Sequence, residues 1–130
     1  MTSTPQLRIL VVDDEALIRW SLCELLRVHG HTVLEAASAS EARAAIDEAA
    51  PAFDVVLLDY RLPDSNDLKL LEEVRRRMPE SAIVLMTAYG GHDVVEGAME
   101  RGAYRVIDKP FDMLAVDSMV RNAHRATRIH

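Results

Sequence analysis

The sequence predicts an α/β protein built on a doubly wound, five-stranded parallel sheet. Short apolar runs alternate five times with longer stretches that have helical periodicity. The apolar runs are nearly continuous, which is typical of strands that helices cover on both faces. Most of the runs also end at a charged or polar residue, as expected where parallel strands deliver functional side chains to one edge of a sheet.

Length and composition favour one globular domain. We expect a single domain over 1–130 with an ordered core over 5–128, because 130 residues suffice for one hydrophobic core. The formal net charge of -6 argues against direct binding of nucleic acid or of an anionic membrane. Cys23 is the single cysteine, and no apolar run approaches the roughly 18 residues that span a bilayer. We therefore expect a cytoplasmic protein.

The first strand and helix are expected at Leu7–Val12 and Ala16–His29. The run LRILVV is rich in branched residues, which favour strands, and Gly30 is well placed to end the helix. A second, weaker strand is expected at Thr32–Glu35. Apolar residues of the helix recur on one stripe, as expected where a helix packs on a sheet. They are Ile18, Leu22, Leu25 and Leu26.

The middle of the chain continues the same alternation. Ser38 and Glu41 have the spacing of a capping box, so an alanine-rich helix is expected to begin there and to end before Pro51. The apolar run Asp54–Leu58 predicts the third strand. A polar loop follows it and leads into a helix near Leu68–Met78.

The last third is expected to supply two strands and two helices. Strands are predicted at Ala82–Met86 and Tyr104–Ile107, with a helix over roughly Val94–Arg101 that Gly102 ends. The final helix is expected over Asp112–Arg128. Its buried candidates are Leu114, Met119 and Val120.

Charged or polar side chains stand at the ends of four predicted strands. The carboxyl ends of parallel strands meet at one edge of a sheet, so these residues are expected to converge although they are far apart in sequence. They are Asp13, Asp14, Asp59, Thr87 and Lys109.

This set suits a phosphoryl group held with a metal ion. Gathered carboxylates raise each other's pKa, and Mg²⁺, which favours a few carboxylates, relieves the repulsion. The ammonium of Lys109 and the hydroxyl of Thr87 complement a phosphoryl dianion. Asp59 stands alone at its strand end, and a carboxylate can accept a phosphoryl group. Strand-end charges that merely solvate the rim are the simpler interpretation, but the whole ordered set favours function.

The chain resembles the receiver domain of two-component response regulators over essentially its full length. The matching segments are VVDDE, VVLLDYRLP, VLMTAYG and IDKPF, in this order. The segments MTAYG and GAYRVIDKPFD are most similar to receivers of sigma-54-dependent activators of the nitrogen-regulator kind. The resemblance implies a flavodoxin-like (βα)5 fold with strand order 2-1-3-4-5.

The resemblance also implies a magnesium site and a phosphoacceptor. It assigns Mg²⁺ to Asp14, Asp59 and the backbone carbonyl of Arg61, with Asp13 acting through water. It makes Asp59 the residue that is phosphorylated, and Thr87 and Lys109 the residues that contact the phosphoryl group. A cis peptide is implied at Lys109–Pro110, where an X-Pro bond keeps the cis penalty small.

The implied function is a signalling switch that takes its phosphoryl group from a histidine kinase. Such a domain catalyses only its own phosphorylation and dephosphorylation and is not an enzyme acting on a metabolite. Its partners would be an output domain or downstream regulator, and a second copy in a possible homodimer. No direct contact with nucleic acid or membrane is expected.

Two positions, 106 and 67, depart from the family pattern. Val106 stands where receivers usually carry a switch aromatic, and Tyr104 is expected two residues earlier on the same strand face. We therefore expect signalling to rely on the loop over 88–93 and the helix after it. Asp67 replaces a usual glycine, either at a positive φ angle or as a helix cap, and Asp64 adds negative charge. The side chains of Arg61 and Tyr89 are expected to flank the mouth of the site and to slow hydrolysis.

Two other functions compete with the switch. Phosphatases of the haloacid dehalogenase type share the ingredients, but they place two acids as D-x-D, and this chain has adjacent Asp13 and Asp14. A phosphate-independent receiver that only binds proteins is the other alternative, because the switch aromatic is missing. Nucleotide binding is disfavoured, since neither GxxxxGK[ST] nor GxGxxG follows a strand.

Overall fold

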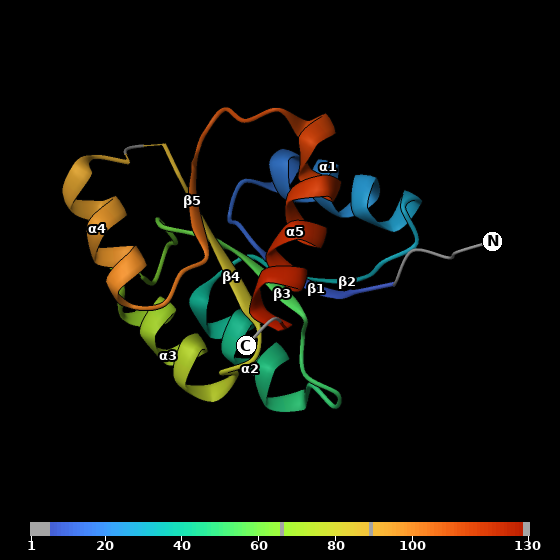
Figure 1. The fold of residues 1–130 in the computed structure, drawn as a ribbon, viewed down its shortest axis with the longest axis horizontal. Helices are drawn as coiled ribbons and strands as arrows, with labels where there is room; N and C mark the ends of the chain where they lie inside the picture. The colour runs from blue at the N-terminus through green and yellow to red at the C-terminus, as the bar shows by residue number, and fades with distance from the viewer. Residues whose placement is uncertain (1–5, 66, 89, 129–130) are drawn as a thin grey trace.

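A computed structural model describes residues 6–65, 67–88 and 90–128 (Figure 1). Its centre is a five-stranded parallel sheet in the order β2-β1-β3-β4-β5, which confirms the predicted fold class and strand order. The strands are β1 (Arg8–Val12), β2 (Thr32–Ala36), β3 (Val55–Asp59), β4 (Ala82–Thr87) and β5 (Arg105–Asp108).

Helices cover both faces of the sheet and bury two hydrophobic clusters. One face carries α1 and α5, which contribute Leu22 and Val120 among other residues. The opposite face carries α2, α3 and α4, with Ile46 and Leu71 in its cluster. The helices are α1 (Ala16–Val28), α2 (Ala39–Glu48), α3 (Lys69–Arg77), α4 (His92–Glu100) and α5 (Val116–Arg128). Among the described residues no helix is both long and apolar enough to cross a bilayer.

The predicted helix boundaries have local physical causes. Ser38 accepts a hydrogen bond from the Glu41 amide at 3.1 Å and so caps α2, as its spacing predicts. The carboxylate of Glu41 returns to the Ala37 amide at 3.0 Å, one residue earlier than in a standard capping box. Gly30 has a φ of 93°, the left-handed conformation that ends a helix at glycine with little cost.

The prediction that Leu114 is buried in the last helix is wrong. Residues Met113–Ala115 form a separate 3-10 turn, η1, and α5 begins only at Val116. Asp112 caps this turn by accepting from the Leu114 amide at 3.0 Å. The turn shifts the helical phase, so Leu114 points outward and is 85% exposed. Val120 is fully buried, as predicted, and Met119 packs at the edge of the core.

Candidate functional site

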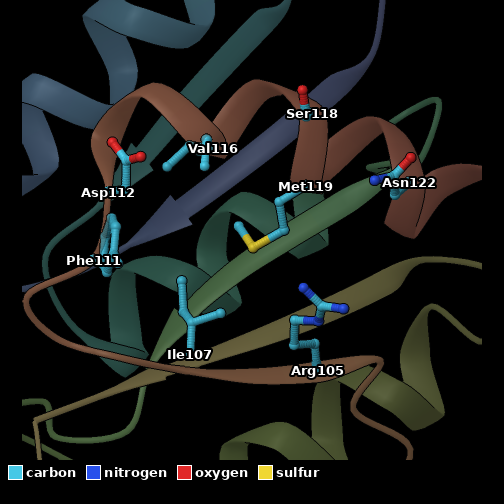
Figure 2. Close-up of a pocket in the computed structure, with 9 residues that line it drawn as sticks. Arg105, Ile107, Phe111, Asp112, Val116, Ser118, Met119 and Asn122 are labelled. Atoms are coloured by element: carbon cyan, nitrogen blue, oxygen red, sulfur yellow. The ribbon is translucent and has the colours of Figure 1, made fainter.

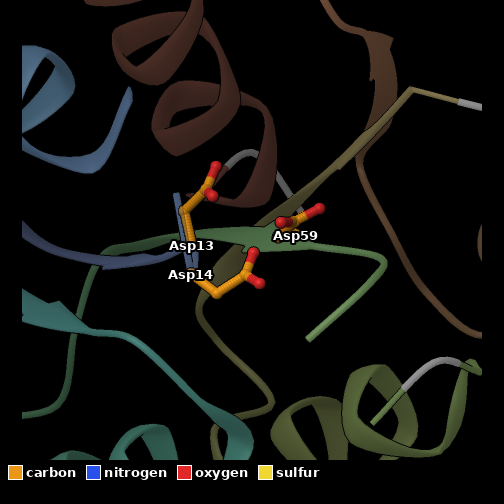
Figure 3. A group of neighbouring side chains, drawn as sticks. All are labelled: Asp13, Asp14 and Asp59. Carbon is orange, nitrogen blue, oxygen red and sulfur yellow. The ribbon is translucent and has the colours of Figure 1, made fainter. Parts of the chain in front are cut away.

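The acidic residues at the strand ends converge, as the sequence predicts. Asp13 follows β1, Asp14 lies beside it, and Asp59 is the last residue of β3. Figure 3 shows the three carboxylates grouped around the end of β3. One oxygen from each lies within 4.8 Å of the others, a spacing that one metal ion can bridge. β1 pairs directly with β3, which explains why residues far apart in sequence meet here.

Lys109 supplies a positive charge next to these carboxylates. Its Nζ lies 2.9 Å from Asp13 Oδ2, 3.2 Å from Asp59 Oδ2 and 3.2 Å from Glu15 Oε1, and its side chain is only 8% exposed. Burial lowers the pKa of Lys109, but the hydrogen bonds and charges of Asp13, Asp59 and Glu15 outweigh burial and raise it. The ammonium is therefore charged at every physiological pH. The Lys109–Pro110 peptide is cis, as predicted.

The surroundings of Asp59 disfavour its ionised form. Its Oδ1 accepts a hydrogen bond from the Arg61 amide at 3.3 Å, and its Oδ2 faces Lys109. Burial and then the charge of Asp13 raise the pKa of Asp59 to about 6, although Lys109 and the Arg61 amide act in the opposite direction. Additional positive charge at this point would stabilise the ionised carboxylate.

The donor set fits a hard divalent cation. Asp13 Oδ2 is a fully buried oxygen that, apart from its ion pair with Lys109, accepts no hydrogen bond from the residues that the structure describes. A buried polar atom of this kind is costly unless a ligand or water satisfies it. The three clustered carboxylates outnumber the ammonium of Lys109, which pairs with two of them, so the site carries excess negative charge. Asp14, which is exposed, offers an oxygen to the same point.

An open depression of about 290 Å³ gives solvent access to these groups. Thr87 lies in its wall at the end of β4 and is almost fully buried. Arg61 also lines the depression, as predicted, whereas Tyr89 lies outside the described residues. The lining residues are Asp14, Glu15, Asp59, Arg61, Thr87, Ala88 and Lys109.

Two residues of the site were missed by sequence reasoning. Glu15 contacts Lys109 across 94 residues of sequence. Arg19 donates from Nη1 to the backbone carbonyl of Asp13 at 2.8 Å, and its Nε pairs with Glu35 at 3.0 Å. Arg19 thereby fixes the backbone that presents the acidic pair. Its place one turn into the helix after the acidic loop was the only sequence signal for this role.

The aspartates of the loop after β3 serve the helices. Asp67 accepts from the Lys69 amide at 2.9 Å, at the first residue of α3, whereas Leu68 stands at the N-cap position without a side-chain cap. No described residue other than glycine has a positive φ, so the suggestion of a positive φ at Asp67 is wrong. Asp64 accepts from the Ala39 and Ser40 amides at 2.8 and 2.9 Å, at the start of α2. Both bonds lower the pKa of Asp64, and neither aspartate lines the depression.

The expectation that Tyr104 shares a face with Val106 is also wrong. Tyr104 precedes β5, where the alternation of a strand does not apply, and packs on the cluster beneath α1 and α5. Val106 packs on the opposite cluster. Tyr104 therefore lies on the wrong face of the sheet to replace the switch aromatic that is missing at Val106.

The chain matches known proteins over most of its length. Residues 9–121 match the family model described as response regulator receiver domain. The DNA-binding transcriptional regulator NtrC of Salmonella typhimurium is 34% identical over 113 residues, which are 87% of this chain and 24% of that protein. The response regulator protein PilR of Pseudomonas aeruginosa is 35% identical over 120 residues, which are 91% of this chain and 26% of that protein. The chain thus spans about a quarter of the length of these relatives.

Solved structures agree with the sequence matches. A receiver domain protein from Methanospirillum hungatei superposes with a TM-score of 0.88 at 27% identity, covering 95% of this chain and 98% of that one. NtrX from Brucella abortus gives a TM-score of 0.84 at 33% identity, covering 96% of this chain and 28% of that one. The beryllofluoride-activated NtrC4 receiver domain, a dimer in solution, gives 0.84 at 30% identity, covering 92% of this chain and 98% of that one.

Proposed function

The chain belongs to the response regulator receiver domain family, and on that premise we propose that it is a phosphorylation-operated signalling switch. The observation that carries the proposal is the position of Asp59. Its carboxylate lies at the wall of an open acidic depression, with the Lys109 ammonium 3.2 Å from one of its oxygens. This arrangement gives a phosphoryl group both a nucleophile and a cation to neutralise its charge.

In the proposed reaction, an oxygen of Asp59 attacks the phosphorus of a phosphohistidine on the kinase. The P–O bond forms as the P–N bond breaks, and the imidazole leaves with the electron pair and takes up a proton. Asp14, Asp59 and the backbone carbonyl of Arg61 would hold Mg²⁺, with Asp13 acting through water. A Mg²⁺ ion bound there would neutralise charge on the transferred group. Thr87 and Lys109 bind the phosphoryl oxygens, Thr87 by its hydroxyl and Lys109 by its ammonium.

A direct labelling experiment tests the switch. The protein is incubated with acetyl phosphate and Mg²⁺, and the mass of the intact chain is measured. We expect one phosphoryl group on the wild-type protein, none on Asp59→Asn, and none in the presence of excess chelator. A wild-type chain that stays unlabelled would favour the alternative of a phosphate-independent receiver that only binds proteins. Turnover of an added phosphoester would instead favour the phosphohydrolase.

The output of the switch is proposed to pass through the loop after β4 and helix α4. Gly90 lies against the end of β5, so close that a β carbon there would meet Asp108 Oδ1 and the methyl group of Thr87 at 2.5 and 3.0 Å. Movement of Thr87 toward a phosphoryl group would disturb this contact directly. Val106 offers no ring to rotate, so the displacement is expected in the backbone around Gly90. Structures with and without beryllofluoride test this, and an unchanged backbone there would refute it.

Two surfaces are proposed to contact partners. The histidine kinase is expected at the start of α1, next to the acidic depression, where Leu17 and Trp20 are exposed apolar side chains. An output domain, a downstream regulator or a second copy is expected on the α4-β5-α5 side. A groove of about 320 Å³ lies there between β5 and α5, with Ile107, Phe111 and Met119 in its wall (Figure 2). We place the whole exchange in the cytoplasm and propose transcription as the process that it controls.

A further inference from the structure

Glu15 provides a third carboxylate for the ammonium of Lys109. It stands at the N-terminal boundary of α1, but its side chain makes no capping hydrogen bond. Its backbone amide donates instead to Asp13 Oδ1 at 2.9 Å, which fixes the residue beside the depression. The side chain reaches over the depression, and its Oε1 accepts from Lys109 Nζ at 3.2 Å.

Three carboxylates surround the ammonium of Lys109, all within 3.2 Å of its Nζ. A phosphoryl oxygen that binds Nζ at ion-pair distance competes with all three for the same small, buried ammonium. At least one of the three carboxylates must therefore give way. Asp13 is fully buried and is held through its other oxygen by the Glu15 amide, so its release is costly. Asp59 is the acceptor itself and remains next to the group that it carries.

Glu15 is the carboxylate that leaves at the lowest cost. Its side chain is 58% exposed, so water can solvate the carboxylate as soon as it swings away from Lys109. No other described side chain pairs with it. The three partners of Lys109 thus differ in burial, and burial decides which of them yields.

We propose that Glu15 holds the ammonium of Lys109 in place until a phosphoryl oxygen displaces it. This proposal rests on the switch function proposed above. Without a phosphoryl group, Glu15 helps to hold the ammonium in place. When a phosphoryl group arrives, Lys109 exchanges Glu15 for a phosphoryl oxygen. Glu15 thereby acts as a positioning residue that opposes the phosphorylated state. An exposed ion pair of this kind is weak, so the opposition is expected to be about two- to fivefold in affinity.

The test measures the binding of beryllofluoride, a phosphoryl mimic, at saturating Mg²⁺. The half-saturating concentration is read from the backbone amide resonances of Thr87 and Lys109, so no catalytic turnover is needed. In Glu15→Gln the charge is removed while the shape is kept, and binding is expected to become about two- to fivefold tighter. In Glu15→Asp the charge is kept, but the side chain is shorter by about 1.5 Å, one C–C bond, and no longer reaches Lys109.

The aspartate variant separates displacement from simple charge repulsion. If Glu15 acts by holding Lys109, Glu15→Asp binds beryllofluoride as tightly as Glu15→Gln. If Glu15 only repels the anion, Glu15→Asp behaves like the wild type, and the proposal is refuted. Unchanged or weaker binding by Glu15→Gln also refutes it.

A control on the same helix accounts for net charge. Glu24 is an exposed carboxylate of α1, and Glu24→Gln is expected to leave the half-saturating concentration unchanged. An equal effect of Glu24→Gln and Glu15→Gln would overturn the proposal. Thermal midpoints of the variants confirm that each is folded. If the wild-type protein binds no beryllofluoride, the proposed function fails; if it binds while the Glu15 variants match it, only the role of Glu15 fails.

Discussion

Both ends of the sheet carry aspartates beside basic side chains. At one end the negative charge is in excess, and at the other it is balanced. At the carboxyl ends of the strands, the carboxylates of Asp13, Glu15 and Asp59 share the ammonium of Lys109. At the opposite end, buried His31 precedes β2 and is matched on both ring nitrogens. Its Nδ1 accepts from the Leu7 amide at 3.0 Å, and its Nε2 lies 2.7 Å from Asp117 Oδ1. Asp54, before β3, accepts from the Arg8 amide at 2.8 Å.

The pKa values express this difference. Burial raises the pKa of Asp117, but hydrogen bonds from His31 and Arg121 outweigh it, so the net pKa is lowered. For Asp59, burial and Asp13 outweigh Lys109, and the pKa is raised to about 6. The charges around Asp117 are thus balanced and contribute to stability. The charges around Asp59 leave an excess of negative charge, which a bound ligand would balance. Four predictions test this contrast.

The largest effect is expected from Asp59→Asn. It should abolish labelling by acetyl phosphate completely, because the amide cannot accept a phosphoryl group. It should also raise the free energy of unfolding of the metal-free protein at pH 7 by about 1 to 2 kcal/mol, since the ionised carboxylate is disfavoured there. Urea unfolding measures the second effect. A less stable Asp59→Asn protein would show that the site is already balanced without a cation.

Magnesium is expected to stabilise the protein and to lose this effect in acid. At a concentration 100 times the Kd, a bound ion adds about 2.7 kcal/mol to the free energy of unfolding. The folded-state pKa of Asp59 is raised to about 6, so a proton competes with the ion as the pH falls through that value. Thermal midpoints with and without Mg²⁺ should therefore converge below pH 6. A gap that stays constant down to pH 5 would contradict the role of Asp59 in binding.

The balanced end should affect stability alone. Asp117→Asn removes the charge that His31 and Arg121 share, and we expect the free energy of unfolding at pH 7 to fall by about 2 kcal/mol. Because the pKa of Asp117 is lowered in the folded protein, its contribution is present at neutral pH and is lost in acid. Labelling of Asp59 by acetyl phosphate should remain at the wild-type rate. A slower rate would mean that the two ends are coupled.

The smallest effect is expected from Arg19→Gln. Loss of the bond to the Asp13 carbonyl frees the acidic loop, and the affinity for Mg²⁺ should fall about threefold to tenfold, the cost of about one hydrogen bond. Arg27→Gln is a matched control, because Arg27 also pairs with Glu35 but donates to the Val33 carbonyl, outside the site. Titration by calorimetry compares them. Equal losses in both variants would assign the effect to helix α1 rather than to the loop.

Much of the fold could be predicted from the sequence because its signals are local. Apolar runs and caps such as Ser38 placed every strand and helix within a few residues. The convergence of Asp13, Asp59 and Lys109 followed from the rule that parallel strands end at one edge. Leu114 was misplaced because periodicity does not distinguish a 3-10 turn from the first turn of a helix.

The parts that could not be predicted depend on contacts between distant segments. Tyr104 lies just before its strand, where the period of two does not hold. The hydrogen bonds of Asp64 and Asp67 depend on which backbone amides lie nearby, and for Asp64 these belong to α2, 25 residues away in sequence. The approach of Glu15 to Lys109 spans most of the chain and leaves no pattern in the sequence.

The ammonium of the site belongs to Lys109, which follows the last strand of the sheet to be synthesised. Lys109 follows β5, which pairs only with β4 at the border of the sheet. A nascent chain that has not yet been extended through residue 109 would carry the acidic cluster without this ammonium. The site is therefore complete only once β5 has been synthesised and has paired with β4.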